Sequence, residues 1–317
     1  MAQTMSDFGI IIGCYQRDYT FARGTVASVR YYMPEVPICL LVDGAFPTDD
    51  LQRAYGVKPF YRADIKNDFL RERSFGWGLP KMVAFWESPF ERFLFLDADT
   101  IVLGDIRPKL FSGPESGNWD LFIDKPRYGF DEKGVTKFFF DVPLLGKHFP
   151  NFPWRDYANR YYCTGVWAAR RGIFDLKEYQ AILEVKKSEP TMFQMAEMGF
   201  LNFMIFRGEA EGRLKVSAAE IQIIAPDFSL DELKKRWQID RPPAALPAEE
   251  AAVLHYTSIK PTRIQGMVAR PMTHFRAKAL SKCGLPAAQS AFRMWKEDMP
   301  FDLRRWKANL ISLIPGR

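Results

Sequence analysis

The segment FLFLDADT, residues 93–100, decides the expected fold class of this 317-residue chain. Its first four residues are large and apolar, which is typical of a strand buried on both faces of a sheet. The two carboxylates that follow, Asp97 and Asp99, are separated by one residue, so both can reach the same cation from one turn. Carboxylate oxygens suit Mg²⁺ or Mn²⁺, especially where a diphosphate completes the coordination. The segment therefore predicts a strand that ends in a metal site.

Strand-like and helix-like segments alternate in front of this motif. Short apolar runs predict strands, and the segments between them have helical character. The expected strands are residues 8–13, 37–43, 58–61 and 92–96, and the expected helices are residues 20–33, 46–55 and 80–86. This order predicts an α/β fold with a mainly parallel sheet that helices cover on both faces.

Polar residues follow two of the expected strands. Cys14, Tyr15 and Gln16 come after the first strand, and residues 97–99 come after the strand at 92–96. In sheets of this kind, ligands bind at the carboxyl ends of the strands. The placement of these residues therefore favours a nucleotide site.

The second half of the chain has weaker periodicity. Residues 111–154 are rich in Gly, Pro and aromatic residues, and they predict a strand at 119–124 followed by long loops of the kind that bind substrates. Further strands are expected at residues 161–169, 219–224 and 252–256, helices at 176–187 and 193–206, and a surface linker at 242–252.

Two chemistries share the Asp-x-Asp-x-Thr string that begins at Asp97. One is a haloacid-dehalogenase-like phosphohydrolase, in which Asp97 is the nucleophile. That motif normally lies on the first strand of its domain, whereas residues 1–91 precede the strand here, and the later acidic pair of such enzymes is missing. The other chemistry is the binding of a nucleotide sugar.

The second alternative rests on a resemblance to GT-A-fold glycosyltransferases, and most closely to glycosyltransferase family 8. Residues 93–106 resemble the metal-binding segment of that family. Further similar segments follow in the family's order and together cover most of the chain from residue 8 to about residue 263: Lys81-Met82, residues 119–124, 161–166, 197–202 and 253–261. The resemblance implies a GT-A, Rossmann-like sheet.

The resemblance also implies roles for individual residues. His255 becomes a third metal ligand beside Asp97 and Asp99, although an isolated histidine is more often structural. Lys260 neutralises the diphosphate, and Asp124 and Glu197 contact the donor sugar or lie beneath its anomeric carbon. The remaining donor-binding candidates are Cys14, Tyr15, Gln16, Lys81, Ala98, Thr164 and Gly165.

The implied reaction is transfer of a sugar from a nucleoside-diphosphate sugar, expected to be a UDP-sugar, to an acceptor hydroxyl. It depends on Mn²⁺ or Mg²⁺ and retains the anomeric configuration, and the expected acceptor is a lipid-linked or cell-surface glycan. The sequence departs from the family at Cys163, where an Asn is usual, and at Glu197-Met198-Gly199, which replaces Asp-Gln-Asp. These departures keep open a third alternative, a nucleotide-sugar-binding protein without activity.

The C-terminal segment is basic. Residues 263–317 contain 11 Lys/Arg and 3 Asp/Glu, a net charge of +8 in a chain whose total is +6. Leu303, Trp306, Leu310 and Leu313 recur at helical spacing, so this segment predicts a basic amphipathic helix that either docks on an anionic membrane or packs on the domain. We therefore expect a catalytic domain at residues 1–262 and an extension at 263–317. No recognised nucleic-acid-binding motif accompanies the charge.

The cysteines and the hydropathy of the chain indicate where in the cell the protein is expected. The four cysteines lie far apart, which excludes a zinc ribbon and argues against a disulfide scaffold. No apolar stretch approaches the roughly 18 residues of a membrane span, and the N-terminus lacks the pattern of a secretory leader. We therefore expect a cytoplasmic protein, located at the inner face of the membrane if the extension binds there.

Overall fold

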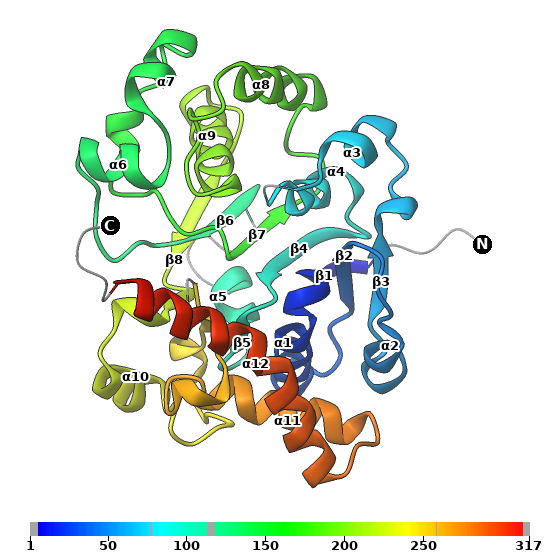
Figure 1. Ribbon diagram of the computed structural model, residues 1–317. Coiled ribbons are helices and arrows are strands. Elements are labelled where there is room, and N and C mark those ends of the chain that lie inside the picture. The colour runs from blue at the N-terminus through cyan, green and yellow to red at the C-terminus, as the bar shows by residue number, and fades with distance from the viewer. Residues whose placement is uncertain (1–5, 77, 113–117, 258, 313–317) are drawn as a thin grey trace.

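The computed structural model describes residues 6–76, 78–112, 118–257 and 259–312. Its larger sheet has the strand order β3-β2-β1-β4-β7-β6-β8, and a smaller sheet has the order β5-β10-β9 (Figure 1). The strands are β1 (Ser6–Tyr15), β2 (Ile38–Asp43), β3 (Lys58–Tyr61), β4 (Phe90–Asp97), β5 (Thr100–Val102), β6 (Leu121–Asp124), β7 (Val166–Arg170), β8 (Val216–Ala219), β9 (Gln222–Ile224) and β10 (Val253–His255).

The larger sheet is mixed but mainly parallel, as the sequence predicts. Strands β3, β2, β1 and β4 pair in parallel, whereas β7 runs antiparallel to both β4 and β6. The first five residues of the FLFLDADT segment form the end of β4, in the middle of the sheet, and its last residue, Thr100, begins β5. Its place on the fourth strand along the chain is not the first-strand position that a haloacid-dehalogenase-like enzyme requires.

Alternation along the strands builds a core on each face of the sheet, because successive side chains point to opposite sides. On β4, Leu94 and Leu96 belong to one core, and Phe93 and Phe95 belong to the other. The first core also contains residues of α1 and α11, and the second contains residues of α8 and α9. Helices therefore cover both faces of the sheet, as Figure 1 shows.

The helices have these bounds: α1 (Tyr19–Tyr32), α2 (Asp49–Tyr55), α3 (Asp68–Arg73), α4 (Ala84–Glu87), α5 (Arg107–Phe111), α6 (Glu132–Phe138), α7 (Val142–His148), α8 (Leu176–Ser188), α9 (Glu197–Ala210), α10 (Leu230–Trp237), α11 (Arg270–Lys282) and α12 (Ala287–Ser312). Two 3-10 helices also position residues of the site: η1 (Gln16–Asp18) and η3 (Leu79–Val83).

The structure corrects the expected organisation in three places. Residues 111–154 are not mainly long loops, since α6 and α7 form there; Asp131 caps α6 through the N–H of Gly134, and Asp141 caps α7 through the N–H of Leu144. The strand expected at 219–224 is divided between β8 of the large sheet and β9 of the small sheet. Of the strand expected at 161–169, residues 161–165 are a loop.

The two C-terminal helices pack on α1. Arg276 of α11 is 1% exposed and forms an ion pair of 2.7 Å with Asp298 of α12. Phe301 of α12 is buried, with its ring centroid 5.1 Å from that of Phe21 on α1. The side chains of Leu310 and Leu313, expected on an apolar stripe, lie outside the described residues. The division of the chain at residue 262 stays a prediction.

Helix α12 is the longest helix in Figure 1, where it crosses the front of the molecule in red. Within the part of the chain that the structure describes, no helix combines the length and the apolar character needed to cross a membrane.

Candidate functional site

A cavity of about 1520 Å³ opens at the carboxyl ends of β1, β2, β4 and β6. This volume exceeds the roughly 300–1,000 Å³ of most small-molecule sites. Strand ends supply Tyr15, Asp43, Asp97 and Asp124 to its lining, as expected for a sheet of this topology. The cavity therefore has room for a ligand of several rings, or for two smaller ligands.

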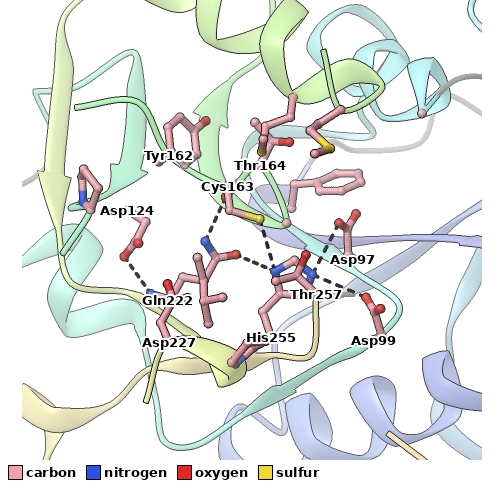
Figure 2. Close-up of a pocket in the computed structure, with 18 of the residues that line it drawn as sticks. Asp97, Asp99, Asp124, Tyr162, Cys163, Thr164, Gln222, Asp227, His255 and Thr257 are labelled. Carbon is pink, nitrogen blue, oxygen red and sulfur yellow. Dashed lines mark hydrogen bonds and ion pairs between the residues drawn. The ribbon is translucent and has the colours of Figure 1, made fainter. Parts of the chain in front are cut away.

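Asp97, Asp99 and His255 line this cavity, and their side chains point toward one another (Figure 2). His255 Nε2 lies 3.9 Å from an oxygen of Asp97 and 3.6 Å from an oxygen of Asp99. One ligand atom from each of the three residues can be chosen so that all lie within 4.8 Å of one another. Two carboxylates and an imidazole form a donor set that suits Mn²⁺, and also Mg²⁺ where oxygen ligands dominate. The three residues fit a divalent cation.

The small sheet brings His255 to the two aspartates. Strand β5 follows the Asp97–Asp99 turn directly and pairs antiparallel with β10, so that Thr100 lies opposite His255. The hydroxyl of Thr100 donates to the carbonyl of Asp97 at 2.8 Å and holds the turn. A strand pair thus places side chains that are distant in sequence around one point.

Gly165 allows the imidazole to lie close against the backbone. A Cβ at this position would lie 2.2 Å from Cε1 of His255, closer than packing allows. The carbonyl of Gly165 accepts a hydrogen bond from the N–H of Asp97 at 2.9 Å. The loop that precedes β7 therefore contacts both the Asp97–Asp99 turn and the ring of His255.

Two lysines neutralise the negative charges of the two aspartates. Lys81 Nζ lies 3.0 Å from Asp97, and Lys260 Nζ lies 2.8 Å from Asp99. Burial alone would raise the pKa of the Asp99 carboxyl, but Lys260 and His255 outweigh burial and hold this pKa well below its usual range. Burial alone would lower the pKa of His255, but Cys163 and Asp99 outweigh it and raise that pKa to about 10.

Glu197 begins α9 and is held beside Lys81. It forms an ion pair with Lys81 and accepts a hydrogen bond from the Thr164 hydroxyl at 2.9 Å. The backbone before it has positive φ values at two non-glycine residues, 48° at Met195 and 55° at Ala196. Such conformations cost roughly 1–3 kcal/mol each and persist where the surroundings impose them. The chain therefore holds a carboxylate at the cavity wall at an energetic cost.

Asp124 is buried at the end of β6. Its Oδ1 accepts hydrogen bonds from the N–H groups of Ile221 at 3.0 Å and Gln222 at 2.9 Å. Burial raises the pKa of this carboxyl to about 7, although the two backbone donors oppose the shift. Asp124 thus connects β6 of the large sheet to the start of β9 and the residue before it, while it lines the cavity.

No protein-family model matches the chain, and the comparison with curated proteins finds no match. Among solved structures, the galactosyltransferase LgtC in complex with donor and acceptor sugar analogs is 16% identical, with a TM-score of 0.51; the match covers 85% of this chain and 95% of LgtC. The bifunctional glycosyltransferase WbbM is 12% identical, with a TM-score of 0.52; the match covers 94% of this chain and 53% of WbbM.

The chain has a GT-A fold. This finding confirms the fold class predicted from the sequence, and it confirms the resemblance to family 8 glycosyltransferases at the level of the fold. In this GT-A fold, the Asp97-Ala98-Asp99 turn lies at the end of β4, beside the carboxyl end of β1. The carboxyl ends of β1 and β4 and the acidic turn therefore line the same cavity.

The GT-A fold brings most of the predicted site residues together. Those that line the cavity are Cys14, Tyr15, Lys81, Asp97, Ala98, Asp99, Asp124, Thr164, Gly165, Glu197, His255 and Lys260. Gln16 is exposed in η1 and does not line the cavity as the described residues define it.

Several polar residues of the cavity were not predicted from the sequence, among them Asp18, Asp43 and Gln222. Asp43 ends a predicted strand, so its position could have indicated a role. Asp18 lies two residues beyond Gln16 and bonds Lys260 at 2.9 Å, a contact that spans 242 positions. Gln222 lies in the segment that was expected to form one strand with β8, and no local pattern distinguishes it.

Proposed function

We propose that the protein is a metal-dependent glycosyltransferase that moves a sugar from a nucleoside-diphosphate sugar, expected to be a UDP-sugar, to an acceptor hydroxyl. The observation that carries this proposal is the cluster of Asp97, Asp99 and His255 at the carboxyl edge of a GT-A sheet, with Lys260 beside it. Departure of a nucleoside diphosphate leaves negative charge on its phosphate oxygens. A divalent cation and a lysine at that point stabilise this charge.

In this proposal Asp97, Asp99 and His255 hold Mn²⁺ or Mg²⁺, which supplies positive charge for the diphosphate. Lys260 stabilises the leaving phosphate, and the strand-end residues Cys14 and Tyr15 contact the nucleoside. Thr164, Gly165 and Ala98 form the adjoining wall of the donor site, together with Lys81. The assignment extends to Gln16 only if the η1 segment moves toward the ligand.

Glu197 and Asp124 belong to the sugar end of the proposed donor site. Glu197 is held by Lys81 and Thr164, so it presents a fixed carboxylate that can stabilise positive charge at the anomeric carbon. Attack of the acceptor on the face that the diphosphate leaves would retain the anomeric configuration. We propose this retaining course because the resemblance implies it.

We also propose that α12 brings the enzyme to an anionic membrane surface, where a lipid-linked or cell-surface glycan is the acceptor. Five exposed apolar residues recur along this helix at helical spacing and form the α12 apolar stripe: Phe292, Trp295, Met299, Leu303 and Trp306. An amphipathic helix with aromatic residues on one face and basic residues beside it is typical of interfacial binding.

Charge on α12 supports a membrane rather than a second copy of the chain. The three acidic residues of the helix point to the protein: Glu297 pairs with Arg23, Asp298 with Arg276, and Asp302 accepts from Thr262. Exposed basic side chains remain at Lys296, Arg304 and Lys307. Two such faces would repel each other, whereas anionic lipid would attract both. Residues 1–262 are then the catalytic unit and residues 263–317 the extension that docks it.

A nucleotide-binding screen followed by a turnover assay tests the proposed function. UDP, GDP, CDP and ADP are added with and without Mn²⁺, and the melting temperature is measured. We expect one nucleotide, UDP, to stabilise the protein only with the metal, and the matching UDP-sugar to be consumed in the presence of a glycan acceptor. Binding without turnover would favour an inactive nucleotide-sugar-binding protein. Phosphate-ester hydrolysis that depends on Asp97, without nucleotide binding, would favour the phosphohydrolase.

A further inference from the structure

Gln222 is a buried polar residue that contacts three parts of the site. It begins β9, is 4% exposed and lines the cavity. Strand β9 pairs in parallel with β10, where Val253 lies opposite Gln222 and His255 follows two residues later. Side chains two residues apart on a strand point to the same face. The strand register therefore places the Gln222 amide beside the His255 ring.

The two ends of the Gln222 amide have different partners. Its Nε2 donates to the carbonyl oxygen of Cys163 at 2.8 Å, and its Oε1 lies 3.0 Å from Nδ1 of His255 (Figure 2). A carbonyl oxygen can only accept, so the NH₂ end of the amide must face Cys163. The oxygen is then the atom that meets His255. An acceptor at this point requires the proton of a neutral imidazole to lie on Nδ1.

The backbone of Gln222 is fixed as well. Its N–H donates to Oδ1 of Asp124 at 2.9 Å, and the neighbouring N–H of Ile221 donates to the same oxygen. The amide is thus anchored at both its backbone and its Nε2, and its Oε1 has little freedom to leave the imidazole. Cys163 Sγ also lies 3.7 Å from Nδ1, but a thiol is a weak hydrogen-bonding group.

We propose that Gln222 is the positioning residue that sets the orientation and tautomer of His255. With the proton held on Nδ1, the lone pair of Nε2 points toward Asp97 and Asp99, where the cation would bind. Hydrogen-bond partners of a metal-binding histidine typically contribute about 10–100-fold in metal affinity. This inference rests on the proposed function, because it assumes that His255 is a metal ligand.

Two substitutions separate a positioning role from a structural one. Gln222→Met fills the same space without an acceptor, so we expect the affinity for Mn²⁺, measured with UDP present, to fall about 10–100-fold. Gln222→Glu keeps an acceptor for Nδ1–H but loses the Nε2 donor to the Cys163 carbonyl, so the affinity should fall less than in Gln222→Met. A merely structural role predicts the opposite order, since a buried carboxylate costs more than a buried thioether.

Mn²⁺ binding is followed by the electron paramagnetic resonance signal of the free ion, and folding by the melting temperature. Gln52→Met, a matched change on α2, is the control and should leave Mn²⁺ affinity unchanged. Equal affinity of Gln222→Met and the wild type, or weaker binding by Gln222→Glu than by Gln222→Met, would overturn the inference while the proposed function stands. If the wild type fails to bind Mn²⁺ in the presence of UDP, GDP, CDP or ADP, both the inference and the proposed function are overturned.

A spectroscopic measurement keeps the inference testable if the variants do not fold. The chain has three histidines, so ¹⁵N-labelled histidine gives few signals, and His148→Gln and His274→Gln assign the other two. In the wild type with Mg²⁺ and UDP, ¹⁵N–¹H correlations identify the protonated nitrogen of His255. A proton on Nδ1 supports the inference, and a proton on Nε2 contradicts it.

Discussion

Lys260 Nζ lies 2.8 Å from Oδ2 of Asp99, and the same ammonium lies 2.9 Å from Oδ2 of Asp18. The lysine that we propose to stabilise the leaving phosphate therefore neutralises, in the free protein, a carboxylate that we propose to bind the metal. A cation arriving alone must compete with this ammonium for Asp99. A cation arriving with a diphosphate provides new partners for both groups, so metal and nucleotide should favour each other's binding.

The first prediction concerns Lys260→Met. Without the ammonium, Mn²⁺ alone should bind as well as or better than it binds the wild type. Nucleoside diphosphate should bind about 10–100-fold more weakly, as expected for the loss of a charge-assisted hydrogen bond. Calorimetric titration of Mn²⁺ and UDP, separately and together, measures both effects. Lys235→Met changes a lysine elsewhere in the same cavity and should leave the coupling intact. Unchanged UDP affinity in Lys260→Met would contradict the role of Lys260.

The second prediction concerns Asp99→Asn. The substitution keeps the size of the side chain but removes the negative charge that the cation and Lys260 both use. We expect Mn²⁺-dependent stabilisation by UDP to be lost and turnover to fall at least about 10²-fold, with the fold preserved by circular dichroism. Asp231→Asn makes the same change at an exposed carboxylate of α10 and should have no effect. Full metal-dependent binding by Asp99→Asn would remove Asp99 from the site.

The third prediction is a pH dependence of metal binding. The pKa of His255 is raised to about 10, so at neutral pH the free imidazole carries a proton that a metal must displace. Mn²⁺ affinity should therefore increase as pH rises, by about tenfold per pH unit between about pH 6 and 8. Titrations at several pH values measure the slope. His255→Gln should bind weakly with a much flatter slope, and a wild type whose affinity is independent of pH would contradict the ligand role.

The fourth prediction concerns stability and Asp124. Its pKa is raised from 3.8 to about 7, so the folded state holds a proton that the unfolded state releases. The free energy of unfolding should therefore fall as pH rises through this window, by at most about 4 kcal/mol. Asp124→Asn stays neutral and keeps an oxygen for the N–H groups of Ile221 and Gln222. It should be more stable than the wild type at about pH 8, and this advantage should shrink toward about pH 4.

Urea denaturation across this pH range measures the effect of Asp124→Asn. Asp120→Asn, just before the same strand, is the matched control, because Asp120 forms an ion pair with Arg170 at the other end of β6. A stability difference between Asp124→Asn and the wild type that does not change with pH would show that the Asp124 carboxyl is not the titrating group.

The fifth prediction concerns the α12 apolar stripe. Truncation after Pro300 would also remove Phe301, which is buried against Phe21, so point substitutions are the better test. Trp295→Ser and Trp306→Ser should each weaken binding to vesicles that contain phosphatidylglycerol by about tenfold, from the apolar area that is lost. Melting temperatures should stay unchanged, because both side chains are exposed.

Vesicle co-sedimentation measures this binding, with pure phosphatidylcholine vesicles as the uncharged comparison. Leu230→Ser removes an exposed apolar side chain from α10 and should bind vesicles like the wild type. If Trp295→Ser and Trp306→Ser also bind like the wild type, α12 is only a helix that packs on the domain.

Much of the fold follows from local sequence. The apolar runs that form β1, β2 and β4 can be predicted because their successive side chains enter the core on both faces of the sheet. Helices α6 and α7 were missed although Asp131 and Asp141 are good capping residues. Each helix has only 7 residues, too short for the periodicity to emerge from the aromatic residues around it. The division of 216–224 between two sheets has no local signal, because either pairing suits the same residues.

The sequence by itself determined the paired carboxylates of the site. Asp97 and Asp99 are two residues apart at a strand end, so local geometry alone keeps them together. The tertiary structure decided their surroundings: the ring of His255 against Gly165, the amide of Gln222 on Nδ1, and the position of Lys260 between Asp18 and Asp99. The physical reason is that hydrophobic periodicity restricts the secondary structure and the buried face of a segment through its own residues. Contacts across 33 to 242 positions depend instead on which strands pair and in which register.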